Sequence, residues 1–221
     1  MVGADPNTTA TIRWGVDLEA YATANRDPTL RRQLLGDGGD SDVLFVGVGR
    51  LIECKGFEYL IDAAASVPGI RVAIIGDGDL RPSLESRARA LGAPVKFVGA
   101  MPQQTIPDAL AAAEGVVVPL VADRSGRIDG FPTTVLEGLA SGRPLVATRT
   151  GGVPELITDG SNGLLVEQKD PAALAVALDR LRANPEERQR LGARGRESVA
   201  GYTWDRSAAA IEKMYERALA P

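Results

Sequence analysis

The chain has 221 residues, 44% of them hydrophobic and 24% charged, which is ordinary for a globular protein of one large domain or two small ones. A formal net charge of -4 offers no basic stripe for nucleic acid, and no apolar run approaches the ~18 residues that span a membrane. The absence of histidine and the single cysteine, Cys54, exclude Ser-His-Asp triads, histidine-ligated metals and internal disulfides. Any chemistry therefore depends on carboxylates, arginine, lysine, hydroxyls and backbone amides.

Short apolar runs alternate with helical patterns from residue 43 onward, after a polar segment of about 40 residues with a glycine-rich patch at 36–40. We predict strands at 43–48, 71–75, 95–98, 115–120, 145–148 and 163–166. We predict helices at 57–67, 80–91, 106–113, 132–141, 171–182, 185–199 and 205–219. Apolar strands that each precede a helix predict an α/β fold: a doubly wound, Rossmann-like parallel sheet of about six strands with helices on both faces.

The distinctive loops of the chain all follow predicted strands. In a doubly wound fold the ligand lies beyond the carboxyl ends of the strands, so these loops meet at one edge of the sheet. They are 47–56, 76–79, 121–132 and 149–154. The sequence therefore predicts a ligand-binding cleft at this edge.

The stretch from Asp129 to Glu137 carries two carboxylates around a predicted helix start. Pro132 suits the first position of a helix, because the amide that proline lacks would be unpaired there. The next amides are free, and the helix dipole attracts an anion to them. One carboxylate thus lies outside a predicted anion site and the other in the second turn, an arrangement that suits a ligand with both hydroxyls and phosphate.

Two cations follow the first predicted strand. The segment Gly47-Val48-Gly49 begins like a dinucleotide fingerprint, but Ile52 stands where that pattern needs its third glycine. Arg50 offers a forked donor and Lys55 a point charge, a pair that suits a diphosphate. Taken alone, each is equally consistent with a solvated surface cation.

Other charged residues near the predicted cleft support simpler interpretations. Asp77 and Asp79 have the D-x-D spacing of some metal-dependent transferases, but we interpret them as a glycine turn in which Asp79 caps the next helix. Arg124, Arg127 and Asp123 are either solvated loop charges or an edge of the ligand site.

A series of segments in a fixed order makes the pattern specific. They are Gly15-Val16-Asp17, Gly49-Arg50-Leu51, Lys55-Gly56, Gly76-Asp77-Gly78, Asp129 to Glu137, Ala140 to Thr148, Gly151-Gly152-Val153-Pro154-Glu155 and Asn162 to Val166. This series resembles the carboxy-terminal half of GT-B retaining glycosyltransferases of family 4 (glycosyl transferases group 1), and it covers nearly the whole chain. Trp14 stands where the family usually has Asn, and Asp129 where it more often has Glu.

The resemblance implies that the chain binds a nucleotide sugar, UDP- or GDP-linked for example, without a metal or other cofactor. Arg50 and Lys55 would hold the diphosphate, Glu137 the ribose hydroxyls and Asp129 the hydroxyls of the donor sugar. The full set of implied donor contacts is Gly49, Arg50, Lys55, Gly76, Gly78, Asp129, Gly130, Phe131, Pro132, Thr133, Thr134, Val135 and Glu137. These carboxylates position the donor, and no catalytic residue is assigned on this chain.

The resemblance also implies a missing amino-terminal domain that binds the acceptor, so that the chain alone would be inactive. The implied organisation is an interdomain segment at 1–40, a nucleotide-sugar-binding domain at 41–204 and a crossover helix at 205–221. Without the missing domain the apolar positions of the crossover helix would lack a partner, which implies either a homodimer through this exposed helix or a disordered end. The single cysteine and the absence of a signal peptide predict a cytoplasmic location, peripheral to the membrane as an alternative in the full-length enzyme.

Three hypotheses of function remain open from the sequence. The first is the donor domain of a hexosyltransferase that retains the configuration of the sugar. The second is a non-catalytic nucleotide-sugar-binding module of the same fold. The third is a Rossmann-type NAD-dependent oxidoreductase or epimerase, which the incomplete glycine fingerprint disfavours.

Overall fold

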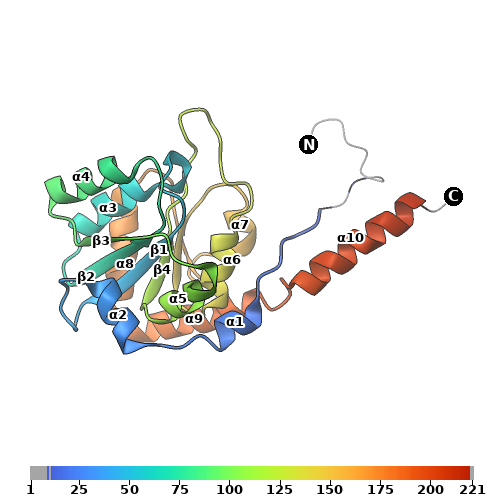
Figure 1. Ribbon diagram of the computed structural model, residues 1–221, viewed down its shortest axis with the longest axis horizontal. Helices are drawn as coiled ribbons and strands as arrows, with labels where there is room; N and C mark the ends of the chain where they lie inside the picture. The colour runs from blue at the N-terminus through green and yellow to red at the C-terminus, as the bar shows by residue number, and fades with distance from the viewer. Residues whose placement is uncertain (1–8, 10, 220–221) are drawn as a thin grey trace.

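The computed structural model describes residue 9 and residues 11–219. Residues 1–8, 10 and 220–221, which belong to the predicted terminal segments, lie outside the described residues. The centre of the molecule is a parallel sheet with the strand order β3-β2-β1-β4-β5-β6 (Figure 1). Its strands are β1 (Val43–Val48), β2 (Ile70–Ile75), β3 (Val95–Gly99), β4 (Gly115–Val118), β5 (Leu145–Thr148) and β6 (Leu164–Val166). This order is that of a doubly wound sheet, so the predicted fold class is confirmed.

Helices cover both faces of the sheet because neighbouring strand residues point to opposite sides. On β1, Leu44 and Val46 belong to one apolar cluster, and Phe45 belongs to the other. The first cluster includes side chains from α1 (Leu18–Ala22), α2 (Pro28–Leu35), α5 (Ile106–Ala111), α6 (Thr133–Ala140) and α7 (Val153–Leu156). The second includes side chains from α3 (Phe57–Ala65), α4 (Arg81–Leu91), α8 (Pro171–Ala183) and α9 (Pro185–Ser198). With apolar partners on both faces the strands need no polar alternation, which explains their continuous hydrophobic sequences.

The predicted strands and long helices match the structure with ends that shift by one or two residues, as hydrogen-bond assignments commonly do. The structure adds the short helices α1, α2 and α7, which were not predicted. α2 begins because Asp27 accepts a hydrogen bond from the Thr29 amide at 2.8 Å and Pro28 occupies the first turn. Its Leu34 and Leu35 are buried against the sheet domain, although the surrounding segment is polar. Part of the segment predicted as interdomain is therefore packed onto the sheet, while the predicted domain boundaries themselves stay predictions.

The predicted cap of α4 is wrong. Leu80 is the N-cap residue and no side chain caps this helix, so Asp79 does not do so. The chain is instead guided into α4 by backbone bonds, from the Leu80 amide to the Leu51 carbonyl at 3.0 Å and from the Arg81 amide to the Gly78 carbonyl at 3.0 Å. The neighbouring loop thus replaces the side-chain cap.

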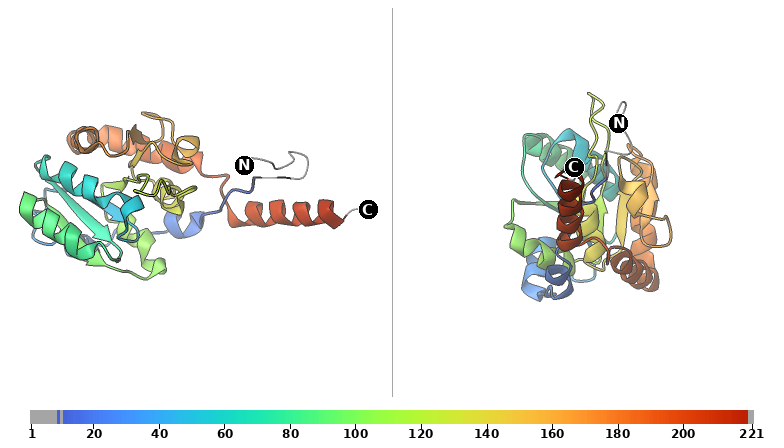
Figure 2. Two further views of the ribbon diagram at one scale, coloured as in Figure 1. Left: turned by 90° about the horizontal axis from the view of Figure 1, so that it is seen from above. Right: turned by 90° about the vertical axis from the view of Figure 1, so that its right-hand side faces the viewer.

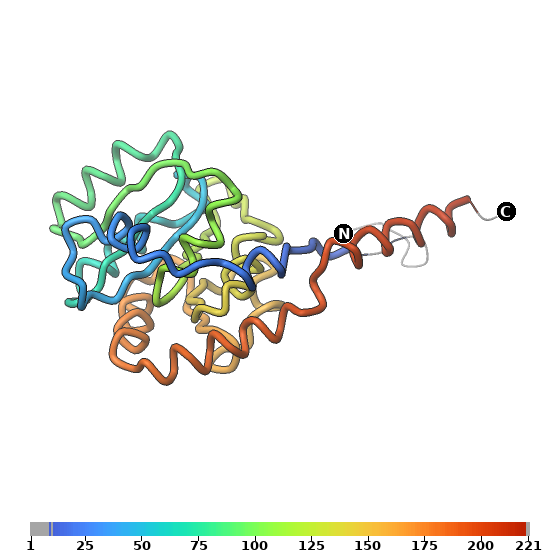
Figure 3. The backbone as a smooth tube through the Cα atoms, turned by 60° about the horizontal axis from the view of Figure 1, so that its bottom comes forward, coloured from blue at the N-terminus to red at the C-terminus, as the bar shows by residue number. Residues whose placement is uncertain are grey.

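The last helix, α10 (Trp204–Leu219), projects away from the rest of the molecule (Figures 1 and 2). Only Ser207 is buried among its described residues, and its hydroxyl donates to the Arg13 carbonyl at 2.7 Å. The segment before α1 leaves the body beside it (Figure 3), with the rings of Trp14 and Trp204 edge to face at 5.8 Å. Large apolar side chains of α10 are exposed, namely Trp204, Ile211, Met214, Tyr215 and Leu219. Within residues 9 and 11–219, no helix combines the length and apolar character needed to cross a bilayer.

Candidate functional site

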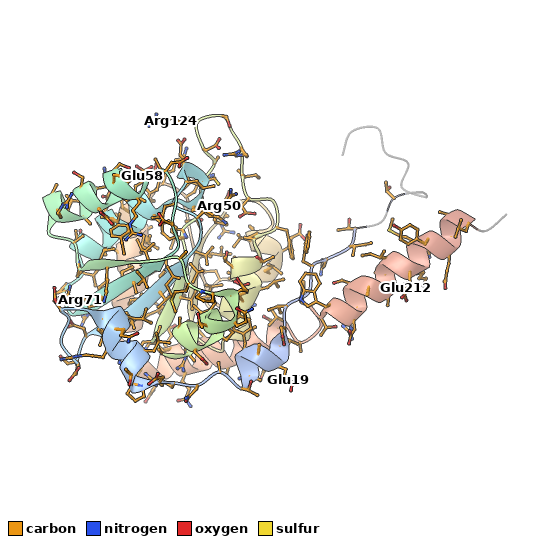
Figure 4. All side chains as sticks on the ribbon, in the orientation of Figure 1. Glu19, Arg50, Glu58, Arg71, Arg124 and Glu212 are labelled. Atoms are coloured by element: carbon orange, nitrogen blue, oxygen red, sulfur yellow. The ribbon has the colours of Figure 1, made fainter. Side chains whose placement is uncertain are left out.

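The carboxyl ends of the strands bring the predicted loops to one edge of the sheet. The loop after β1 contains Arg50, whose side chain is exposed at this edge (Figure 4). In the described part of the chain, its guanidinium makes no hydrogen bond or ion pair. The same loop continues through a 3₁₀ turn, η1 (Glu53–Lys55), to Gly56 and the start of α3. Arg50 is therefore available to an anionic ligand.

Gly56 brings this loop close to the end of β4. It has φ +64° and lies so near the carbonyl of Pro119 that an added Cβ would be 1.8 Å from the oxygen. A left-handed conformation and a backbone approach of this kind are tolerated only by glycine. The sequence pair Lys55-Gly56 thus combines a charge with a turn that packs against the end of β4.

Gly76 and Gly78 lie in close backbone contact with the loop that contains Arg50. A Cβ at Gly76 would lie 1.9 Å from the carbonyl oxygen of Gly49, and one at Gly78 would lie 2.7 Å from that of Leu51. The Leu51 amide also donates to the Asp77 carbonyl at 2.9 Å. These glycines, predicted to contact the donor, have a clear packing role, whereas their contact with a ligand stays a prediction.

The predicted phosphate and sugar residues meet directly. The Lys55 Nζ donates to Asp129 Oδ2 at 2.6 Å, with side chains that are 14% and 27% exposed. Gly151 and Gly152 hold the backbone at Asp129. A Cβ added at Gly151 would lie 2.3 Å from the backbone carbonyl oxygen of Asp129, and the Gly152 amide donates to the Gly130 carbonyl at 2.9 Å. The Gly-Gly pair quoted in the sequence resemblance therefore supports the Asp129 loop, a role that the sequence alone did not reveal.

The N-terminus of α6 faces the same edge. The structure corrects one detail, since Pro132 is the N-cap residue and Thr133 the first helical residue. No side chain caps this helix, so the first amides, at Thr133 and Thr134, have no partner within it. Thr133 is exposed, and the buried Thr134 hydroxyl oxygen has no partner among the described residues. The predicted anion site at this helix start is open to a ligand.

Glu137 lies one turn further along α6 and accepts a hydrogen bond from Gln103 Nε2 at 3.2 Å. Burial raises the pKa of Glu137, while the Gln103 hydrogen bond and the charge of Lys55 lower it. Burial also raises the pKa of Tyr21, with contributions from the charges of Glu137 and Asp17. The carboxylate is thus costly to keep ionised without a hydrogen-bonding ligand.

Beside Glu137 lies a cavity of about 550 Å³. Its lining includes side chains that accept or donate hydrogen bonds, namely Asp17, Tyr21, Gln103, Gln104, Thr133 and Glu137. Gln103 and Tyr21 were not singled out from the sequence. For Gln103 the available signal was its place just after the carboxyl end of β3, at the ligand edge.

Two arginines of the long loop lie away from this cluster. Arg124 is at the tip of the loop (Figure 4), 94% exposed, with Glu53 Oε1 at 3.3 Å from its Nε. Arg127 pairs with Asp123 at 3.1 Å. Hydrogen bonds from Ser125 lower the pKa of Asp123, and the amide and the charge of Arg127 lower it further. The structure favours solvated loop charges for both arginines, with Asp123 organising the loop.

Comparisons with known proteins agree with this architecture. The family model described as glycosyl transferases group 1 matches residues 27–198. The chain is 34% identical over 233 residues to a D-inositol 3-phosphate glycosyltransferase of Frankia alni, covering 99% of this chain and 55% of the relative. A sucrose-phosphate synthase structure from Thermosynechococcus elongatus superposes with a TM-score of 0.82 at 27% identity, over 95% of this chain and 52% of that one. The Anabaena protein HepE, solved in complex with UDP and glucose, shares the fold with a TM-score of 0.83 at 23% identity, over 97% and 59%.

The doubly wound sheet, with its strand order and the loops at its carboxyl edge, has the architecture of one half of a GT-B glycosyltransferase. The chain belongs to the glycosyl transferases group 1 family. It spans about half the length of the curated relatives it matches.

Proposed function

We propose that this chain is the donor-binding domain of a retaining glycosyltransferase, which transfers a hexosyl group from a nucleoside-diphosphate sugar to an acceptor bound by another domain. One observation carries the proposal. Lys55, predicted for the diphosphate, and Asp129, predicted for the donor sugar, meet at 2.6 Å although they lie 74 positions apart in the chain. The two subsites that the resemblance implies are therefore adjacent, as the two ends of one nucleotide sugar require.

The chemistry of such a transfer matches these groups. As the bond to the sugar breaks, negative charge develops on the departing diphosphate and must be stabilised. Arg50, Lys55 and the free amides at the start of α6 supply positive charge and hydrogen-bond donors for it. Asp129 and Glu137 are hydrogen-bond acceptors for sugar and ribose hydroxyls, which are neutral donors.

We propose that the reaction needs no metal ion. The first carboxylate of the D-x-D spacing is engaged within the fold, because Asp77 accepts from the Gly78 amide at 2.8 Å and lies 3.4 Å from Arg81. Donor binding is expected to be equal with Mg²⁺ and with a chelator. Binding that requires Mg²⁺ and is lost in Asp79→Ala would contradict this part of the proposal.

A second domain is part of the proposal. The apolar side chains on α10 are exposed, and the relatives are about twice the length of this chain. Exposed apolar surface of this extent marks a contact with another chain or domain. We propose that the acceptor-binding domain packs there, with a homodimer through α10 as the alternative.

Calorimetry with UDP, GDP and ADP and their sugars tests donor binding. A charge-assisted hydrogen bond contributes about 1.5–3 kcal/mol, so Arg50→Ala should weaken binding of the preferred nucleotide roughly 10- to 150-fold. Its melting temperature should stay unchanged, because the side chain is exposed and unpaired among the described residues.

Arg194→Ala is the matched control, because Arg194 is an exposed arginine on α9, outside the cleft. It should bind nucleotides as the unmodified protein does. The proposal fails if the unmodified protein binds none of these nucleotides at millimolar concentration. Binding of NAD that is tighter than that of every nucleotide sugar would favour an oxidoreductase instead.

A further inference from the structure

The ion pair between Lys55 and Asp129 has a consequence for ligand selectivity. It is largely shielded from solvent, with side chains 14% and 27% exposed, so its charges are screened less than those of a surface pair. Arg50, on the same loop, has no such partner among the described residues. One of the two cations assigned to the diphosphate is thus already neutralised by the carboxylate assigned to the sugar.

The pair retains hydrogen-bonding capacity that the described residues do not use. An ammonium group has three donors, and in the described part of the chain Lys55 uses one of them, toward Asp129 Oδ2. Asp129 Oδ1 has no partner among the described residues. A diphosphate bound to Lys55 would therefore lie beside Asp129, close enough for the two negative charges to repel each other.

A free nucleoside diphosphate and its sugar ester differ at this point. The terminal phosphate of the free diphosphate has an additional ionisable oxygen, with a pKa near 6, where the ester carries the sugar. When that oxygen is ionised near Asp129, its negative charge and the carboxylate repel each other. The sugar of the intact donor instead brings hydroxyls that donate hydrogen bonds to the same carboxylate.

We propose, building on the proposed function, that Asp129 is a specificity-determining residue that makes the site reject the free nucleoside diphosphate in favour of the intact nucleotide sugar. The Asp129 carboxylate competes with the diphosphate for Lys55. Only hydroxyls of the bound sugar offset this repulsion, because they donate hydrogen bonds to the carboxylate. The same repulsion promotes release of the diphosphate product after transfer.

Calorimetry of Asp129→Asn with UDP and UDP-glucose, or with the preferred pair from the first titration, tests this inference. Asparagine retains the shape of the side chain and removes the charge. Repulsion between unit charges about 7 Å apart at an effective dielectric constant near 20 corresponds to a factor of roughly 50 in affinity, which solvent reduces at a partly exposed site. We expect Asp129→Asn to bind the free diphosphate roughly tenfold more tightly and the nucleotide sugar no more tightly than before.

Asp205→Asn, an exposed carboxylate on α10, controls for the change in net charge and should leave both affinities unchanged. The inference is overturned if Asp129→Asn binds the free diphosphate equally or more weakly, or if both ligands gain by the same factor. If the unmodified protein binds neither ligand, the proposed function itself fails, which is a different result.

A measurement on the unmodified protein keeps the inference testable should Asp129→Asn not fold. The β-methyl ester of the nucleoside diphosphate lacks both the additional charge and the sugar. We expect it to bind at least as tightly as the free diphosphate. A preference of more than tenfold for the free diphosphate would contradict repulsion by Asp129.

Discussion

The two loops that carry the candidate donor residues, 49–56 and 121–132, form two sides of the candidate site and are held in place in different ways. On the side of Gly49 to Gly56, backbone groups hold one another, as in the bonds from Gly49 to Ile75 and from Leu51 to Asp77. On the side of the loop before α6, carboxylates add to the backbone bond from Gly152 to Gly130: Asp123 accepts from Ser125 and Arg127, and Asp129 from Lys55. Backbone contacts cannot exchange for ligand groups, whereas carboxylates can. We therefore expect stability to depend mainly on the first side and ligand selectivity on the second.

The largest expected effect is on the backbone-built side. Gly56→Ala places a Cβ 1.8 Å from the Pro119 oxygen at φ +64°, so the end of β4 or the start of α3 must move. Strain and displaced packing of this kind should lower the free energy of unfolding by at least about 3 kcal/mol. Chemical denaturation measures the loss.

Gly92→Ala is the matched control for Gly56→Ala. Gly92 has φ +60°, but among the described residues no atom beyond its chain neighbours lies within 4 Å of its added Cβ. It should lose only the roughly 1–2 kcal/mol of a left-handed alanine. Equal losses in the two variants would show that the contact with Pro119 does not matter.

A smaller effect is expected where Gly151 supports the Asp129 loop. Gly151→Ala brings a Cβ to 2.3 Å from the backbone carbonyl oxygen of Asp129, and the loop around Asp129 is exposed, so it can move to relieve the contact. We expect a loss of about 1–3 kcal/mol in the free energy of unfolding, with affinity for the nucleotide sugar falling more than affinity for the free diphosphate.

Gly160→Ala serves as the comparison for Gly151→Ala, since Gly160 has φ +70° and its added Cβ would meet no described residue beyond the chain neighbours within 4 Å. Calorimetry with both ligands separates the two variants. Equal losses of affinity for the diphosphate and the sugar ester would remove the distinction between the two sides of the candidate site.

The smallest expected effect concerns Glu137, whose pKa is raised chiefly by burial. In the unfolded chain this carboxyl group ionises at its ordinary pKa, and in the fold only at higher pH. Between the pKa of Glu137 in the unfolded chain and its higher pKa in the fold, unfolding releases a proton. The free energy of unfolding therefore falls as the pH rises from the lower to the higher pKa. Glu137→Gln should remove this dependence and stabilise the unliganded protein at neutral pH by about 0.5–2 kcal/mol, within the range of single stabilising substitutions.

Thermal unfolding from pH 4 to pH 8 measures the effect of Glu137→Gln. The same variant should bind nucleotides more weakly, because an amide is a poorer acceptor for ribose hydroxyls than a carboxylate. A variant less stable than the unmodified protein at neutral pH would show that ionised Glu137 stabilises the fold.

The strands and long helices were predictable because their periodicity is local. Val43 to Val48 is apolar throughout, as a strand covered on both faces must be. α2 was not predicted because its contribution to the core comes from Leu34 and Leu35 within a polar segment. The cap expected from Asp79 failed for a related reason, since a neighbouring loop supplies the bond that a side chain would otherwise make.

The sequence by itself determined the parallel α/β fold, the edge of the sheet at which the candidate residues lie, and the residue types available there. Only the tertiary structure decided how these residues meet: Lys55 with Asp129, Gln103 with Glu137, and Gly151 beneath the Asp129 backbone. The physical reason is distance along the chain. Hydrophobic periodicity is set by neighbours within a few positions, whereas an ion pair between residues 74 positions apart exists only after β1 and β4 have paired.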